Sequence, residues 1–192
     1  MPAHGLSLIL LAAGQGRRFG ANKLLHPLPN GVPIGLASAR ALGPVAGRRI
    51  AVLASHQTVL AGLLAAEGWE TLICADAHLG MGHSLAAGIA TSPEASGWLV
   101  ALADMPFIQP VTHQHLADQL ARGARLVAPT YQGQRGHPVG FGAEWRPQLL
   151  ALHGDTGARP ILQAHPEALR LCPVDDAGVL RDVDVVGDVP AG

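Results

Sequence analysis

Short apolar runs alternate with helix-like segments along nearly the whole 192-residue chain. The runs read as buried strands because they are short, rich in Leu, Ile, Val and Ala, and do not alternate with polar residues. They cover residues 6–11, 49–54, 70–75, 98–103, 126–129 and 137–141, with shorter candidates at 170–174 and 180–185. The helix-like segments cover residues 34–41, 57–66, 82–90 and 113–122. This alternation predicts an α/β protein whose doubly wound, mostly parallel sheet carries helices on both faces.

Nothing in the sequence divides the chain into two units. It contains no linker, internal repeat or low-complexity tract, so we expect residues 1–192 to form a single domain. A domain of this length is large enough to bury a substantial core. In doubly wound sheets, ligands bind outside the carboxyl ends of the strands. The residues that directly follow each predicted strand are therefore the candidates for a functional site.

Charge and cysteine content exclude several classes of protein. The net charge is −1, so no overall basic field would attract nucleic acid. Two cysteines, Cys74 and Cys172, are too few for a disulfide framework or a four-cysteine metal site. The first apolar run is too short to span a membrane and lacks the basic start of a signal peptide. We expect a cytoplasmic protein with no nucleic-acid or membrane partner.

A glycine-rich, basic loop follows the first predicted strand. Residues 10–23 read Leu-Leu-Ala-Ala-Gly-Gln-Gly-Arg-Arg-Phe-Gly-Ala-Asn-Lys. Glycines let backbone N–H groups approach a ligand closely, and three cations beside them favour a polyanion such as a triphosphate. The spacing excludes a Walker A loop, because Leu24 follows the lysine, and also the Gly-x-Gly-x-x-Gly dinucleotide fingerprint. A surface turn is the alternative, which the position after the first strand makes the weaker interpretation.

A second polar segment, Leu-Ala-Asp-Met-Pro at residues 102–106, follows the fourth predicted strand. The carboxylate of Asp104, in a segment stiffened by Pro106, can ligate Mg²⁺ through oxygen, although an Asx-turn or a helix cap is the alternative. This segment and the glycine-rich loop resemble the Asp-x-Pro and Ala-Gly-x-Gly-x-Arg-Phe-Gly-x-x-Lys motifs of the MobA-like nucleotidyltransferases. The resemblance implies a Rossmann-like domain that transfers a nucleoside monophosphate to a phosphorylated acceptor and releases pyrophosphate.

Further segments extend this resemblance to about residue 188. Gly-Met-x-x-Ser-Leu at residues 80–85 is similar to the family loop that lines the nucleotide base and sugar. From the residues alone, Ser84 can either cap the following helix or donate a hydrogen bond to a ligand. His83 is taken as a loop residue that faces the site or solvent, because it has no visible carboxylate partner.

The second half of the chain contains the residues expected to bind the second substrate, the phosphorylated acceptor. Arg-Gly-His-Pro at residues 135–138 resembles the Gly-His-Pro segment of molybdenum cofactor cytidylyltransferases, and residues 154–159 resemble the loop near their pterin substrate. A hairpin turn at residues 133–136 is the alternative. Asp182-Val-Asp184 matches the start of the family's Asp-Ile-Asp-Thr-Pro ending, where one Asp completes the metal site. Val185-Val186 stand here in place of Thr-Pro, and either Asp could face solvent.

The resemblance also implies which nucleotide is used and which residues act. Leu-Ala-Ala-Gly at residues 11–14 is the pattern of the cytidylyl branch, which makes molybdopterin cytosine dinucleotide from CTP and Mo-molybdopterin with Mg²⁺. The implied catalytic residues are Lys23, Asp104 and Arg18. The implied nucleotide-binding residues are Leu11, Ala12, Ala13, Gly14, Gln15, Gly16, Arg17, Arg18, Phe19, Gly20, Lys23, Gly80, Met81, Ser84 and Asp104. The implied second-substrate residues are Arg135, Gly136, His137, Pro138, Asp155 and Arg159, and the implied metal ligands are Asp104, Asp182 and Asp184.

Three alternatives stay open at this point. The same chemistry could serve guanylyl transfer to molybdopterin, or cytidylyl transfer to a sugar or polyol phosphate. A cofactor-handling accessory protein, in transient contact with a molybdenum hydroxylase or its chaperone, is a non-enzymatic alternative. A general accessory role in purine catabolism is the third. Lys23 and Asp104 favour an enzyme, because binding alone would not need a metal ligand in that place.

Overall fold

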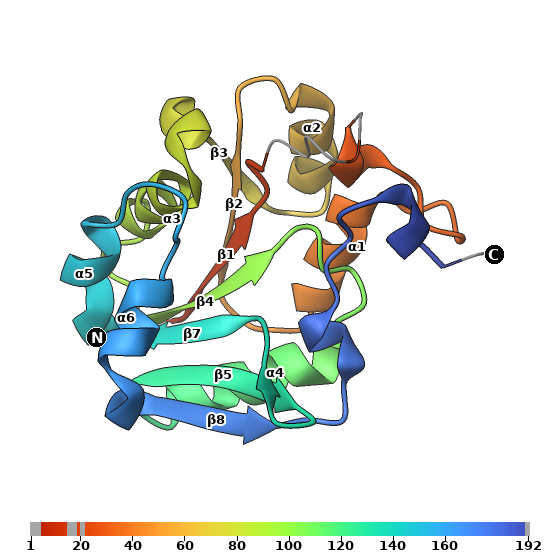
Figure 1. The fold of residues 1–192 in the computed structure, drawn as a ribbon. Helices are drawn as coiled ribbons and strands as arrows, with labels where there is room; N and C mark the ends of the chain where they lie inside the picture. The colour runs from red at the N-terminus through yellow and green to blue at the C-terminus, as the bar shows by residue number, and fades with distance from the viewer. Residues whose placement is uncertain (1–4, 15–18, 20–21, 191–192) are drawn as a thin grey trace.

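An eight-stranded sheet runs through the centre of the molecule (Figure 1). The computed structural model describes residues 5–14, 19 and 22–190. The strand order is β3-β2-β1-β4-β7-β5-β6, and β8 pairs with β5. The strands are β1 (Ser7–Leu11), β2 (Arg48–Leu53), β3 (Glu70–Ile73), β4 (Gly97–Leu102), β5 (Leu126–Tyr131), β6 (Gln134–Arg135), β7 (Val139–Gly142) and β8 (Leu169–Pro173). Strands β1 to β4 are mutually parallel, as are β5 and β8, whereas β7 is antiparallel to both β4 and β5.

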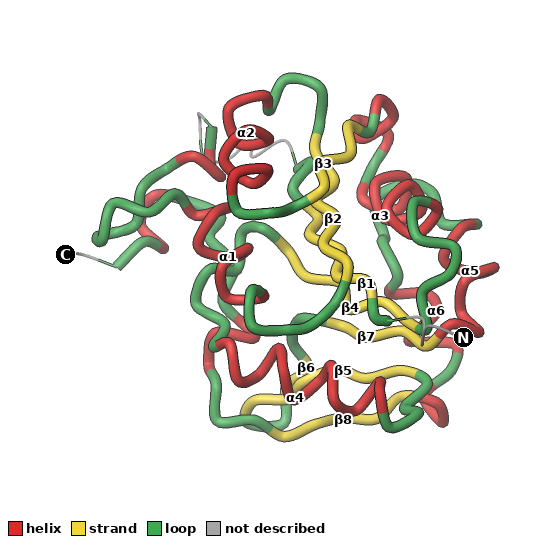
Figure 2. Tube along the Cα trace, turned by 180° about the vertical axis from the view of Figure 1, so that it is seen from behind, coloured by secondary structure: helices red, strands yellow, loops and turns green. Residues whose placement is uncertain are grey.

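Two layers of helices cover the sheet, one on each face (Figure 2). One layer holds α1 (Ile34–Leu42), α2 (Thr58–Ala66) and α4 (Pro110–Ala121), and the other holds α3 (Met81–Ala90), α5 (Arg146–Leu150) and α6 (Arg159–Ala164). Short 3₁₀ helices connect them: η1 (Lys23–Leu25), η2 (Ala75–Leu79), η3 (Ala143–Trp145), η4 (Pro166–Ala168), η5 (Ala177–Leu180) and η6 (Val186–Asp188). The predicted α/β, mostly parallel, doubly wound fold is confirmed.

The central strands are buried on both faces, which explains their unbroken apolar sequences. Successive side chains of a strand point to opposite faces, so Leu8 and Leu10 of β1 pack in the core shared with α1, α2 and α4. Ile9 and Leu11 pack in the second core, which includes Leu85 of α3. Every residue of β1 is buried. Because this strand lies between β2 and β4, the loop that follows it leaves the centre of the carboxyl edge.

One predicted strand is wrong and another begins later than expected. Residues 180–185 form no strand, because their amides bond elsewhere: that of Val183 donates to the carbonyl of Asp104 at 2.9 Å, and that of Val185 donates to the carboxylate of Asp188. The segment predicted at 137–141 becomes a strand at Val139, because Pro138 has no N–H to give to a ladder. Helices α5 and α6 and strand β6 were not predicted from the sequence.

The hairpin alternative is confirmed, but its turn covers residues 131–134, two residues earlier than the expected 133–136, and Gln134 and Arg135 lie in β6. Strands β5 and β6 pair in antiparallel fashion around Gln132 and Gly133, whose φ angles are 49° and 79°. Positive φ at both central positions is typical of two-residue hairpin turns. Among the helices of the described residues, none combines the length and the apolar character that crossing a membrane requires.

Candidate active site

A pocket of about 370 Å³ opens at the carboxyl edge of the parallel strands, within the size range of small-molecule sites. It is the place where doubly wound sheets bind ligands. Nine predicted nucleotide-binding residues line it: Leu11, Ala12, Ala13, Gly14, Lys23, Gly80, Met81, Ser84 and Asp104. Five other residues complete the lining: Leu24, Ala77, His78, Leu102 and Asp155.

Among the remaining predicted nucleotide-binding residues, only Phe19 is described, and it is not part of this lining. Gln15, Gly16, Arg17, Arg18 and Gly20 lie outside the described residues. The Phe19 ring packs edge-on against the His26 ring at 5.1 Å, and Phe19 contacts the core on the α1 side.

Four pocket residues were not predicted from the sequence: Leu24, Ala77, His78 and Leu102. Each lies within three positions of a residue that was predicted, so proximity along the chain was the available signal.

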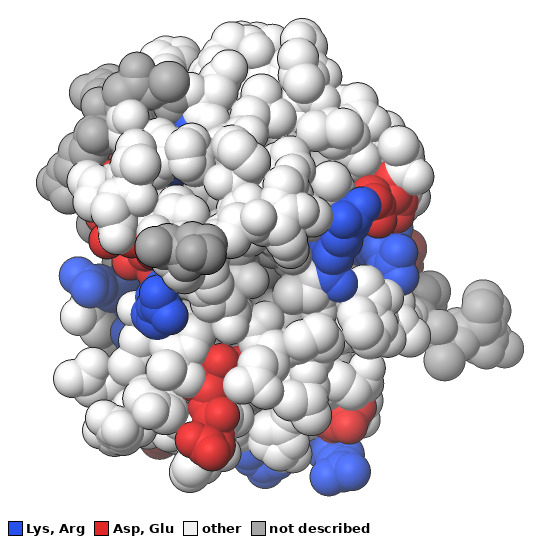
Figure 3. Space-filling view, turned by 90° about the vertical axis from the view of Figure 1, so that its right-hand side faces the viewer, with Lys and Arg blue, Asp and Glu red and all other residues white. Residues whose placement is uncertain are grey.

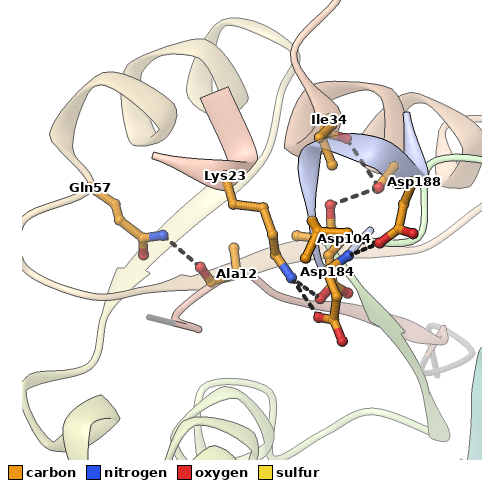
Figure 4. A network of polar contacts seen from close by, with 10 residues as sticks. Ala12, Lys23, Ile34, Gln57, Asp104, Asp184 and Asp188 are labelled. Atoms are coloured by element: carbon orange, nitrogen blue, oxygen red, sulfur yellow. Dashed lines mark hydrogen bonds and ion pairs between the residues drawn. The ribbon is translucent and has the colours of Figure 1, made fainter. Parts of the chain in front are cut away.

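Lys23 lies between two carboxylates (Figure 4). Its Nζ is 2.8 Å from Oδ2 of Asp104 and 3.4 Å from Oδ1 of Asp184, and only 11% of its side chain is exposed. Burial lowers the pKa of Lys23, but the hydrogen bond and charge of Asp104, together with Asp184, outweigh burial, so this pKa is raised above its usual value. The ammonium group is therefore charged at neutral pH.

Three carboxylates converge beside Lys23. Oxygen atoms of Asp104, Asp182 and Asp184 all lie within 4.8 Å of one another. Between the last two, Val183 is fully buried, while Asp182 is exposed and Asp184 is half-buried. Two oxygens bound to one Mg²⁺ lie up to about 4.2 Å apart, so small side-chain rotations suffice for these groups to hold a divalent cation. Both carboxylates of the Asp-x-Asp motif belong to the cluster.

Strand β4 and one buried hydroxyl fix the position of Asp104. Ser38 of α1 is buried, and its Oγ lies 2.8 Å from the carbonyl oxygen of Ala103 and 3.1 Å from that of Ile34. Helix α4 begins at Pro110, six residues beyond Asp104, so the helix-cap alternative for this Asp is wrong. Its carboxylate instead faces Lys23.

Asp188 holds the segment that carries the other two carboxylates. Its Oδ2 accepts from the amide of Asp184 at 2.8 Å and from that of Val185 at 2.9 Å (Figure 4). The amides of Val185 and Asp184 hold the pKa of the Asp188 carboxyl below its usual value, so the acceptor is ionised. Asp188 was not among the residues predicted from the sequence.

Gln57 joins the loops that follow β1 and β2. Its Nε2 donates to the carbonyl of Ala12 at 2.7 Å (Figure 4). Its Oε1 accepts from the amide of Ala54, also at 2.7 Å. The Ala12 contact spans 45 positions of the chain, so no local pattern could have revealed it. Gln57 thereby fixes the backbone where Ala12 and Ala13 line the pocket.

The segment at residues 80–85, which contains the first turn of α3, packs closely against residues 153–157. Gly80 has φ +124°, and a Cβ on it would lie 2.4 Å from the carbonyl of Gly154, so glycine is required there. His83 lies in the first turn of α3, so the expectation that it is a loop residue is wrong, and its Nδ1 accepts from the amide of Gly154 at 3.3 Å. Gly80 is the N-cap of α3, so the capping alternative for Ser84 is wrong, and Ser84 is buried in the pocket wall.

The predicted second-substrate residues separate into two groups. The amide of His137 donates to the carbonyl of Val179 at 3.0 Å. Burial lowers the pKa of His137, while the charges of Asp104 and Asp182 oppose this and that of Arg135 adds to the lowering. Asp155 instead lies with the pocket residues, and Arg159 is exposed at the start of α6.

Gly136 and Pro138 flank His137, and both are buried, whereas Arg135 is exposed in β6.

Charged side chains form small groups separated by uncharged surface on the face shown in Figure 3.

The model of the MobA-like NTP transferase domain matches residues 8–169. The chain belongs to the MobA-like NTP transferase family. It is 33% identical over 189 residues to the purine catabolism protein PucB of Bacillus subtilis, covering 92% of this chain and 90% of PucB. It is 31% identical over 201 residues to the bifunctional protein GlmU of Dinoroseobacter shibae, covering 98% of this chain but only 41% of that longer relative.

Solved structures share the fold of this MobA-like chain. Rv0371c of Mycobacterium tuberculosis superposes with a TM-score of 0.84 at 25% identity, covering 96% of this chain and 95% of that one. A manganese complex of Rv0371c gives 0.80 at 24% identity, again covering 96% and 95%. Mth528, a nucleotidyl transferase from Methanothermobacter, gives 0.82 at 21% identity and covers 97% and 94%.

The family and its relatives make the chain a nucleotidyltransferase. Enzymes that transfer phosphoryl or nucleotidyl groups generally use a divalent metal ion. The carboxylate cluster of Asp104, Asp182 and Asp184 is where the described residues could hold one.

Proposed function

We propose that this chain transfers CMP from CTP to Mo-molybdopterin, with Mg²⁺, and releases pyrophosphate. The observation that carries the proposal is the Lys23–Asp104–Asp184 group at the rim of a pocket lined by Ala12, Ala13 and Gly14. A cation and clustered carboxylates at the carboxyl edge suit a ligand that joins phosphates to a metal ion. The whole of residues 1–192 would act as one cytoplasmic domain.

Three sequence features support cytidine over guanine. Ala13 stands where a guanylyl enzyme is expected to carry Gly, and its backbone lies in the pocket wall beside Gly14. The Gly-Met-x-x-Ser-Leu loop places Met81 and Ser84 in the same wall. Arg-Gly-His-Pro at residues 135–138 is the third feature, and the charges of Asp104 and Asp182 act on the pKa of His137.

The nucleophile needs no general base. A terminal phosphate oxygen of molybdopterin is already ionised at neutral pH, so it can attack the α-phosphorus of CTP directly. The new bond joins that oxygen to the α-phosphorus, the bond to the β-phosphate oxygen breaks, and pyrophosphate leaves. The protein must therefore hold the two substrates in line and neutralise charge around the α-phosphate.

Lys23 is assigned to the α-phosphate, where charge builds up in the transition state. Arg18 and the backbone amides of residues 14–20 are assigned to the β- and γ-phosphates. Asp104, with Asp182 and Asp184, would hold Mg²⁺, which when bound neutralises phosphate charge. Charge neutralisation would thus come from both sides of the α-phosphate.

The acceptor would bind on the far side of the carboxylate cluster. His137 is neutral at pH 7 and can donate to or accept from the pterin phosphate, with Arg135 near enough to affect its pKa. Gly136 and Pro138 shape this segment, and Asp155 and Arg159 are assigned to the pterin side. The product would pass to a molybdenum hydroxylase or its chaperone by transient contact.

The test is pyrophosphate release with CTP or GTP, each with and without molybdopterin. We expect turnover only with CTP and molybdopterin, and a loss on the order of 10²- to 10³-fold in Lys23→Ala and Asp104→Ala. The controls are Arg122→Ala and Glu94→Ala, which remove exposed charges outside the pocket and should leave turnover unchanged. Preference for GTP would support the guanylyl alternative. CTP binding without turnover would support an accessory protein, and turnover with a sugar or polyol phosphate a different acceptor.

A further inference from the structure

The segment that carries Asp182 and Asp184 has no sheet to support it. It lies between η5 and η6 and forms no strand, and the backbone hydrogen bond from Val183 to Asp104 at 2.9 Å ties it to the end of β4. Val183 itself is fully buried in the core on the α1 side, which anchors the middle of the segment. These two contacts hold Asp182 near Asp104, but they leave the backbone beyond Val183 to be fixed by something else.

The chain departs from its family's pattern at this point. Val185 and Val186 occupy the Thr-Pro positions of the motif, and Val185 is the N-cap of η6. A threonine at an N-cap supplies a side-chain oxygen for an amide of the first turn, whereas valine has none. The amides of Asp184 and Val185, at and just before the N-cap, are not reached by an N-cap side chain of either kind, so they need an acceptor from another residue.

Asp188 supplies that acceptor with a single oxygen. Its Oδ2 lies 2.8 Å from the amide nitrogen of Asp184 and 2.9 Å from that of Val185. The backbone at Asp184 is thus fixed by Asp188, while the Asp184 carboxylate lies 3.4 Å from Nζ of Lys23 and within 4.8 Å of the oxygens of Asp104 and Asp182. A carboxylate is also a stronger acceptor for such amides than a hydroxyl.

We propose that Asp188 is a positioning residue, which orients Asp184 for divalent-metal binding through the amides of Asp184 and Val185. It does not itself belong to the cluster of converging ligand oxygens. The inference rests on the proposed function for the identity of the metal site. It goes further in assigning a role to a residue outside that site.

The test measures Mn²⁺ binding to the full chain without nucleotide, by titration calorimetry or by the electron paramagnetic resonance of free Mn²⁺. A cap of this kind corresponds to a change of about fivefold to tenfold in an equilibrium constant. We expect Asp188→Ala to weaken Mn²⁺ binding by about that factor, whereas Asp188→Asn, which keeps a side-chain oxygen for the amides, should weaken it less than about threefold. The matched control is Asp175→Ala, an exposed carboxylate in the same part of the chain.

Each outcome separates this inference from the proposed function. Unchanged Mn²⁺ binding in Asp188→Ala would overturn the positioning role, even if the enzyme is active. Equal weakening in Asp188→Asn and Asp188→Ala would also overturn it, because the charge of Asp188 would then act without its hydrogen bonds. A parent protein that binds Mn²⁺ but transfers no nucleotide would refute the proposed function and leave the role of Asp188 standing. If Asp188→Ala does not fold, the Mn²⁺ affinity of Asp188→Asn decides. An affinity close to that of the parent protein supports the positioning role, and a tenfold weaker affinity opposes it.

Discussion

The two segments that supply the carboxylate cluster are built differently. Asp104 directly follows β4, a central strand paired with β1 and β7, and the buried hydroxyl of Ser38 holds the carbonyl of the preceding residue. Asp182 and Asp184 stand on an irregular segment, tied down by one buried side chain, one backbone hydrogen bond and the carboxylate of Asp188. The side chain of Asp104 is 25% exposed and that of Asp184 is 49% exposed. A carboxylate anchored by the sheet and two carried by a loop therefore meet in one cluster.

Because of this difference, Asp104 is held rigidly, whereas Asp182 and Asp184 can adjust their positions. Residues that follow a central strand inherit its position, because shifting them would break ladder hydrogen bonds and core packing. An irregular segment depends on a few contacts, so its ligands can move when a substrate binds.

The largest expected difference is between the two ligands themselves. Asp104→Asn should lower the rate of nucleotidyl transfer on the order of 10²- to 10³-fold, because it removes a fixed charge that is largely shielded from water. Asp184→Asn should cost roughly tenfold less, since water screens a half-exposed charge and the segment can adjust. The measurement is steady-state pyrophosphate release at saturating metal. Equal losses in the two variants would contradict the distinction between the segments.

A pH effect should appear where helix α4 meets the irregular segment. His113 of α4 is buried, burial lowers its pKa to about 4, and the charge of Asp176 only partly opposes this. In the unfolded chain the same imidazole has the ordinary histidine pKa of 6.5, so the stabilising effect of neutral His113 is complete above pH 6.5 and is lost as the pH falls to about 4. The loss should total about 3 kcal/mol of the free energy of unfolding.

Urea unfolding between pH 4 and pH 7 measures this effect. In His113→Leu, which cannot titrate, the free energy of unfolding should fall less steeply over the same range. The comparison of slopes removes the contribution of the carboxylates, which titrate in both proteins. Parallel pH profiles for the two proteins would mean that His113 is protonated without cost in the folded state.

The smallest expected effect concerns the support of Asp104. Ser38→Ala removes the buried hydrogen bond to the carbonyl of Ala103 and should cost about 1 kcal/mol of unfolding free energy. It should also weaken Mn²⁺ binding by about twofold, because Asp104 is the next residue. The matched control is Ser92→Ala, which removes the buried partner of the Trp98 indole N–H away from the pocket. Ser92→Ala should lower the free energy of unfolding by a similar amount without changing the Mn²⁺ affinity. A weaker Mn²⁺ affinity in Ser92→Ala would mean that Ser38→Ala acts through its general loss of stability and not through the position of Asp104.

Much of the architecture could be predicted from local patterns. The apolar runs around β1, β2 and β4 are read correctly because a parallel strand buried on both faces is apolar along most of its length, whereas the edge strand β3 is largely exposed. The segment at residues 180–185 alternates apolar and charged residues, yet it forms no strand, because the amide of the buried Val183 donates to the carbonyl of Asp104 and not to a neighbouring strand. Apolar periodicity reports burial, and it reports a strand only where a neighbouring strand accepts the hydrogen bonds.

By itself, the sequence determined the fold class and the residue types at the carboxyl edge, because burial and glycine geometry act locally along the chain. It placed Lys23, Asp104 and the Asp-x-Asp motif among the candidates, since each follows a strand or matches a short motif. Only the tertiary structure decided that both carboxylates of Asp-x-Asp join Asp104, and that Gln57, Ser38 and Asp188 hold the site. Those hydrogen bonds of Gln57 and Ser38 span 45 and 65 positions, and contacts so distant along the chain form only once the sheet has brought its loops together.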